Sequence, residues 1–97
     1  MELLLNKAIG GFGFSKKFCK LFLDTYGFDL AELCIDDNCD FSFTLDVRSN
    51  TKVLELFKKM GSKFSSSSSS DLELITINPS KEFYIDEIDG VEEIIYV

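Results

Sequence analysis

The sequence predicts an α+β domain, a small mixed sheet with two helices in the order β-α-β-α-β-β-β and a C-terminal β-hairpin. Two segments place apolar residues at the spacing of one helix face. Short apolar runs near both ends of the chain are bounded by turn residues, as strands are. The last two runs flank Asp89-Gly90, the strongest short-range hairpin signal. With 97 residues, the chain is expected to form a single domain over 1–97 around one core.

The first strand and first helix are predicted on either side of a glycine-rich loop. Residues 1–7 are a short apolar run that ends at Asn6-Lys7, and Gly10-Gly11-Phe12-Gly13-Phe14 follows as a loop. Ser15 is the expected N-cap of the helix, and Gly27 lies where a helix-ending glycine is expected. The apolar stripe of this helix is Phe18, Leu21, Phe22 and Thr25.

The middle of the chain predicts a strand and a second helix. Phe41, Phe43 and Leu45 alternate with polar residues, which predicts a strand near 41–47. Ser49 or Asn50 is expected to cap the second helix, and Gly61 to end it. Its apolar stripe is Val53, Leu56, Phe57 and Met60.

The last third predicts a loop and three strands. Serine fills every position from 65 to 70, so a flexible Ser-rich loop is expected over 62–71. The predicted strands cover 72–77, 82–88 and 91–97. The turn between the last two needs a positive φ at both Asp89 and Gly90, as in a type I′ turn.

The net charge of −7 is unevenly distributed along the chain. Residues 1–28 carry +2, residues 29–46 carry −6, residues 47–70 carry +4 and the last 27 residues carry −7. Such acidic surfaces repel phosphates, so duplex DNA is not an expected partner and a basic protein is favoured. The three cysteines are an odd number without framework spacing, which predicts a reducing, intracellular compartment. No apolar run approaches the length that spans a bilayer, so no membrane partner is expected.

The glycine loop is the first candidate site. Gly10, Gly11 and Gly13 let the backbone approach a ligand, and Ser15 stands at a helix start, where free N–H groups bind anions. Two lysines in the first turn oppose the helix dipole unless an anion is bound there. The candidate ligand is a phosphate or nucleotide, and the candidate residues are Gly10, Gly11, Gly13, Ser15, Lys16 and Lys17. The alternative is a purely structural turn in which Phe12 and Phe14 anchor the core.

The acidic hairpin is the second candidate, as a surface that binds a partner. A two-residue turn places Glu87 opposite Glu92 and Asp86 opposite Glu93, and like charges in these positions destabilise a sheet. The compensating cation is Arg48 or a lysine within the fold, a basic partner protein or a divalent metal. The candidate residues are Asp86, Glu87, Asp89, Glu92 and Glu93.

Metal and catalytic sites are not predicted. Asp36, Asn38 and Asp40 resemble the start of a calcium loop, but Phe41 and Val47 stand where that loop needs Gly and Glu. The chain has no His, which excludes a histidine triad or a histidine-ligated zinc site. No nucleophile and base are paired in the sequence, so binding without catalysis and without a cofactor is expected.

Several short segments of the chain match a known pattern: Asn6-Lys7, Gly10-Gly11-Phe12, Ser15, Arg48, Gly61, Leu72 to Ile77, Glu82 to Glu87, Asp89-Gly90 and Glu92. In these segments the chain resembles a family of small uncharacterised proteins encoded largely by tailed bacteriophages and related viruses. The resemblance covers both ends and the middle helix, although Ala8 and Ile9 stand where members carry Cys and an aromatic residue. It implies a viral origin and a fold, with no assigned reaction. We therefore expect a viral accessory protein that binds a host or viral partner, or a small anionic ligand, in the host cytoplasm; a structural role in the virion is the alternative.

Overall fold

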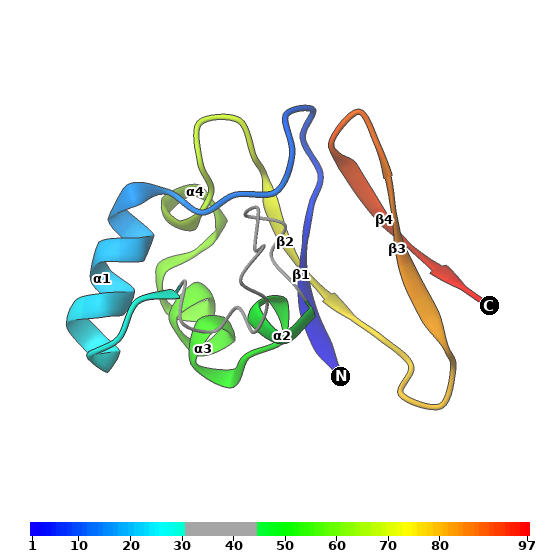
Figure 1. The fold of residues 1–97 in the computed structure, drawn as a ribbon, viewed down its shortest axis with the longest axis horizontal. Coiled ribbons are helices and arrows are strands. Elements are labelled where there is room, and N and C mark those ends of the chain that lie inside the picture. Colours follow the sequence, from blue (N-terminus) through cyan, green and yellow to red (C-terminus); the bar gives the residue numbers. More distant parts are fainter. Residues whose placement is uncertain (31–44) are drawn as a thin grey trace.

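The computed structural model describes residues 1–30 and 45–97 and confirms the α+β class (Figure 1). None of the helices in these two ranges is both long and apolar enough to cross a membrane. The helices are α1 (Lys16–Tyr26), α2 (Leu45–Arg48), α3 (Thr51–Met60) and α4 (Ser62–Ser65). The strands are β1 (Glu2–Asn6), β2 (Leu72–Thr76), β3 (Phe83–Ile88) and β4 (Val91–Tyr96).

The central layer is the antiparallel pair β1–β2, with the helices on one side and the β3–β4 hairpin on the other (Figure 1). Successive side chains of a strand point to opposite faces. Leu4 accordingly packs in the cluster built by the helices, which includes Phe18 and Phe57. Leu3 and Leu5 pack in a second cluster with apolar residues of the hairpin. The run Leu3 to Leu5 is apolar because β1 is buried on both faces.

The two predicted helices and their caps are confirmed. The Ser15 side chain accepts a hydrogen bond from the amide of Phe18, and Gly27 ends α1 with a φ of 81°. Of the two candidate caps for α3, it is Asn50 that accepts hydrogen bonds from α3 amides. Gly61 then follows the end of α3, and its N–H donates to the Phe57 carbonyl.

The strand predicted near 41–47 is wrong in its last part, because Leu45–Arg48 forms the short helix α2. The rest of that prediction lies outside the described residues. Val47 is fully buried beside Leu4 in the core, so packing of α2 against β1 prevails over a short alternation of apolar and polar residues. The single mixed sheet is also wrong for the described strands, which form two separate antiparallel pairs.

The loop predicted over 62–71 needs correction in its first part, where Ser62–Ser65 forms α4. Serine hydroxyls hydrogen-bond to nearby backbone groups, and here that capacity supports a defined structure. The Ser65 hydroxyl donates to the Gly61 carbonyl at 2.7 Å, and the Ser70 hydroxyl donates to the Gly13 carbonyl at 2.7 Å. The second bond joins the serine segment to the glycine loop. The flexibility expected of this segment stays a prediction.

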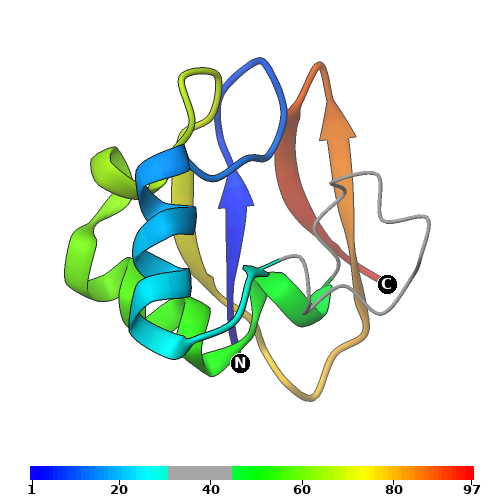
Figure 2. The same ribbon diagram turned by 60° about the vertical axis from the view of Figure 1, so that its left-hand side comes forward.

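The C-terminal hairpin is confirmed with its expected register. Ile88 pairs with Val91, Glu87 with Glu92 and Asp86 with Glu93. Asp89 and Gly90 have φ values of 54° and 89°, which satisfies the two positive angles of a type I′ turn. Figure 2 shows β4 between β1 and β3, so β3 is the outermost strand of the hairpin side of the molecule.

Candidate functional site

The hairpin is joined to the rest of the fold by a buried ion pair between Glu92 of β4 and Arg48 of α2. The two terminal guanidinium nitrogens of Arg48, Nη1 and Nη2, donate to the two carboxylate oxygens of Glu92, at 2.6 and 2.7 Å. Arg48 is 6% exposed and Glu92 is 4% exposed. Two parallel charge-assisted hydrogen bonds of this kind fix geometry as well as charge. Arg48 is therefore the cation within the fold that compensates the negative charge of Glu92 in the acidic hairpin.

The same pair covers the edge of β1 that faces away from β2. The Arg48 guanidinium donates to the Leu4 carbonyl at 3.3 Å, and the Asn6 amide donates to the Glu92 carboxylate at 2.8 Å. Both backbone groups belong to alternate residues of β1 and would otherwise be unpaired at an open strand edge. The ion pair thus replaces a neighbouring strand with two side chains.

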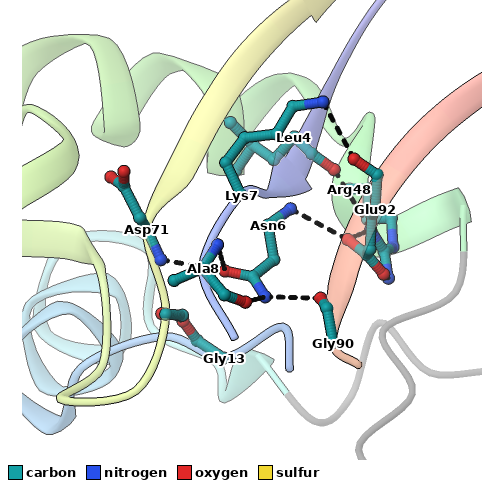
Figure 3. Close-up of polar contacts among 10 residues, drawn as sticks. Leu4, Asn6, Lys7, Ala8, Gly13, Arg48, Asp71, Gly90 and Glu92 are labelled. Carbon is teal, nitrogen blue, oxygen red and sulfur yellow. Dashed lines mark hydrogen bonds and ion pairs between the residues drawn. The ribbon is translucent and has the colours of Figure 1, made fainter. Parts of the chain in front are cut away.

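Asn6 is the centre of the polar contacts at this end of β1 (Figure 3). Its side-chain nitrogen, Nδ2, donates to the backbone carbonyls of Ala8 and Gly90, each at 2.7 Å. Its side-chain oxygen accepts from the amides of Ala8 and Asp71, at 3.2 and 2.9 Å. The side chain is fully buried, so these bonds satisfy an amide that burial would otherwise strongly destabilise. One asparagine therefore ties together β1, the glycine loop, the hairpin turn and the start of β2.

Two further side chains complete this region. The Lys7 ammonium donates to the Glu92 carbonyl at 2.8 Å. The Phe12 ring lies 4.1 Å from the guanidinium carbon of Arg48, which is the geometry of a cation–π contact. We call Asn6, Lys7, Phe12, Arg48 and Glu92 the polar hub. Sequence reasoning considered Arg48 as a cation for the acidic hairpin but missed the role of Asn6, whose signal is a polar residue closing an apolar strand.

The glycine loop lies between the serine segment and the hairpin turn, and the three turns meet at one end of the molecule (Figures 1 and 2). A Cβ atom on Gly10 would lie 2.5 Å from the Ser69 carbonyl oxygen. A Cβ atom on Gly90 would lie 2.4 Å from the Gly11 nitrogen. These glycines therefore allow three backbones to pack closely, which is a structural reason for their presence.

The residues predicted for an anion site do not form one hollow. Gly10 and Gly11 line a hollow of about 470 Å³ whose charged residues are Glu87 and Asp89. Lys16 and Lys17 are exposed on the first turn of α1 and do not line it. The Ser15 hydroxyl donates to the Phe64 carbonyl at 2.6 Å while it caps α1. Phe14 is buried in the core as the structural alternative expected, and anion binding at this loop stays a prediction.

The acidic residues of the hairpin divide into one buried residue and four at the surface. The placement of Glu92 in a partner-binding surface is wrong, because the carboxylate is buried against Arg48. Asp86 and Glu93 lie opposite each other on the face that also carries Tyr84 and Ile88. Glu87 and Asp89 are exposed near the turn. In residues 1–30 and 45–97 no group of three Cys, Asp or Glu residues is placed to hold a metal ion.

Cys19 on α1 is the cysteine within the described residues, and it is a free thiol. Burial raises the pKa of the Cys19 thiol, and the nearby Asp29 carboxylate raises it further. A thiol with a raised pKa is a poor nucleophile because the reactive form is the thiolate. Cys19 is therefore placed for packing against the core.

Comparison of the chain with protein-family models, with curated proteins and with solved structures finds no match.

Proposed function

We propose that the protein acts by binding, and that the outer face of the β3–β4 hairpin is the surface that receives a basic partner protein. We define the outer face as the side of β3 and β4 that is opposite the side packed against the core. Successive residues alternate between the two sides, and the other side carries Phe83, Ile85 and Ile94 toward the core. The outer face consists of Tyr84, Asp86, Ile88, Val91, Glu93 and Ile95.

The observation that carries this proposal is the uncompensated pair Asp86 and Glu93. They are directly opposite each other in the register, where like charges destabilise a sheet. The ion pairs in the described part of the chain are Arg48–Glu92 and Lys58–Glu2, so neither residue belongs to one. Lys7 shares a small hollow with both, but its ammonium donates to the Glu92 carbonyl. A cation from a partner would relieve the remaining repulsion.

The apolar residues around these acids support the same surface. Tyr84 is 53% exposed and Ile88 is 67% exposed, on either side of Asp86 along β3. Interfaces are enriched in tyrosine, and exposed large apolar side chains beside the acids add contact area to a surface that charge alone would make weak. Two acids and no base lie among the residues of this face, Asp86 and Glu93, so the field there attracts positive charge.

The resemblance to small bacteriophage proteins gives this proposal its setting. An accessory protein of an infecting virus would meet a basic host or viral protein inside the host cell. The geometry of the glycine loop favours packing over phosphate capture, because a Cβ atom on Gly10 or Gly90 would meet backbone atoms of a neighbouring turn. Binding of a protein is thus the function that these observations support best.

A fluorescence anisotropy titration tests the proposal. The probe is a labelled peptide of about eight residues that alternates lysine with valine, matched to the length of a strand. We expect Asp86→Asn/Glu93→Gln to weaken binding at least about tenfold, more strongly at low salt. Asp24→Asn/Glu73→Gln is the control, since it removes the same charge from exposed positions on α1 and β2. Equal affinities of the two double variants would refute the proposal.

A further inference from the structure

The open edge of β3 has backbone groups that no other strand of the described residues uses. Val97 N–H donates to the Glu82 carbonyl at 3.0 Å, and Ile88 pairs with Val91 beside the two-residue turn. In an antiparallel hairpin, hydrogen-bonded and non-hydrogen-bonded pairs alternate. Residues 82, 84, 86 and 88 therefore point their N–H and C=O groups toward β4. Phe83, Ile85 and Glu87 point theirs outward, and within the described ranges no hydrogen bond reaches these outward groups.

This edge is protected against other acidic chains only by its own acids, Asp86 and Glu87. Other proteins also protect edge strands with proline, lysine or a bulge, and β3 has none of these. β3 reads Phe-Tyr-Ile-Asp-Glu-Ile, and its register with β4 is continuous over all six residues. By contrast, the corresponding edge of β1 is covered by the Arg48–Glu92 pair. Side chains thus cover the edge of β1, whereas within the described residues none of the hydrogen bonds reaches the outer edge of β3.

The chemistry along β3 changes from apolar to acidic. A hollow of about 550 Å³ lies beside its first half, lined mostly by apolar side chains. Asp86 and Glu87 form the second half, next to Glu93 on β4. An occupant that fits both halves is an extended segment with a bulky apolar side chain for the hollow and a lysine or arginine beside the acids. The residues that line the hollow are Lys81, Glu82, Phe83, Tyr84, Ile85 and Val97.

We infer that the basic partner binds as an added β-strand, pairing the backbone of an extended basic segment with the outward groups of Phe83, Ile85 and Glu87. Main-chain hydrogen bonds then supply affinity, and side-chain pockets on alternate residues supply specificity. A second copy of this chain is a poorer occupant, because each copy carries a net charge of −7 and would bring its own acids to the edge. The inference rests on the proposed function and specifies how the partner is recognised.

Backbone methylation of the peptide separates strand addition from simple charge attraction. Two isomers of the lysine–valine peptide carry N-methyl groups either on the valine amides or on the lysine amides. In an added strand only alternate N–H groups face β3. We expect one isomer to lose at least about tenfold in affinity and the other to remain within about threefold of the unmethylated peptide. Equal affinities of the two isomers would overturn strand addition while leaving the proposed function standing.

A pair of variants at one position tests the edge from the side of the protein. Glu87→Pro removes one outward N–H, and proline is tolerated on an edge strand when its nitrogen faces solvent. Glu87→Gln removes only the charge. We expect the proline variant to bind the unmethylated peptide at least about tenfold more weakly than the glutamine variant, with urea unfolding confirming that both are folded. Equal binding by the two folded variants contradicts the inference, as does self-association that Glu87→Pro abolishes in sedimentation experiments.

Discussion

The Arg48 guanidinium and the Glu92 carboxylate face each other in a two-point contact that joins the helical side of the molecule to the hairpin. They are separated by 44 positions in the sequence and lie at the edge of β1, where each also binds a backbone group of that strand. An ion pair in this position determines where the hairpin docks. Because the Arg48 guanidinium is buried against Glu92, its positive charge does not pair with Asp86 or Glu93 on the other side of the hairpin.

Breaking this pair is expected to destabilise the fold strongly. Glu92→Gln leaves the buried Arg48 charge without its counter-ion, and such changes cost about 3 to 5 kcal/mol of unfolding free energy. Glu2→Gln is the matched control, since it breaks the exposed Lys58–Glu2 pair and costs at most about 1 kcal/mol. Urea unfolding measures both. Similar losses in the two variants would show that the buried pair does not fix the hairpin.

The coupling between the two residues can be measured separately. Arg48→Met combined with Glu92→Gln removes the unpaired charge, so the double variant should lose less stability than the sum of the single variants. The Gln side chain still offers an acceptor to the Asn6 amide. Additive losses would indicate that the two side chains act independently.

Asn6 is expected to matter as much as the ion pair. Asn6→Ala leaves two carbonyls and two amides, all buried or partly buried, without their side-chain partners, a loss of about 3 to 4 kcal/mol. Asn50→Ala is the comparison, because that asparagine only caps α3 and its loss costs about 1 kcal/mol. Thermal and urea unfolding of the two variants give the ranking. An Asn6→Ala loss no larger than that of Asn50→Ala would contradict the role of Asn6 in the hub.

The Cys19 thiol is expected to ionise only at high pH. Burial, followed by the Asp29 carboxylate, raises its pKa above the ordinary value of 9.0. A group whose folded pKa is raised stabilises the fold below its unfolded pKa, and this contribution is lost as the pH rises through the folded pKa. The stability contributed by Cys19 should therefore decline above about pH 9.

Alkylation by iodoacetamide tests this in a Cys34→Ser/Cys39→Ser background. The midpoint of the rate against pH should lie above 9.0 in the native protein and shift downward with Asp29→Asn. Asp24 is an exposed acid on α1, the helix that carries Cys19, and Asp24→Asn should leave the midpoint unchanged. A native midpoint at or below 9.0 would contradict the prediction.

Local signals predicted most of the fold. Ser15, Gly27 and Gly61 end or begin helices through contacts within a few residues, and Asp89-Gly90 forms its turn from its own backbone preferences. The strand near 41–47 failed over Leu45–Arg48 because Val47 is held in the core by β1, a contact that no local pattern encodes. The serine segment was predicted from composition, whereas its bond to Gly13 depends on where the glycine loop lies.

The candidate site was predictable only in outline. Alternation in the hairpin placed Asp86 opposite Glu93 correctly, because a two-residue turn fixes the register. The same alternation could not tell Glu92 from Glu87, since burial of one and exposure of the other depend on Arg48 reaching across β1. The bonds of Asn6 to Gly90 and Asp71 span 84 and 65 positions and have no local signature.

Close packing of the hairpin turn against the glycine loop makes Gly90 more sensitive to substitution than other glycines. Gly90 and Gly27 have similar φ values, 89° and 81°, so alanine is strained at both by about 1 to 2 kcal/mol. A Cβ atom on Gly27 has open space, whereas one on Gly90 meets the Gly11 backbone. Gly90→Ala should therefore cost at least about 2 kcal/mol more than Gly27→Ala in urea unfolding. Equal costs would mean that the two turns are not in contact.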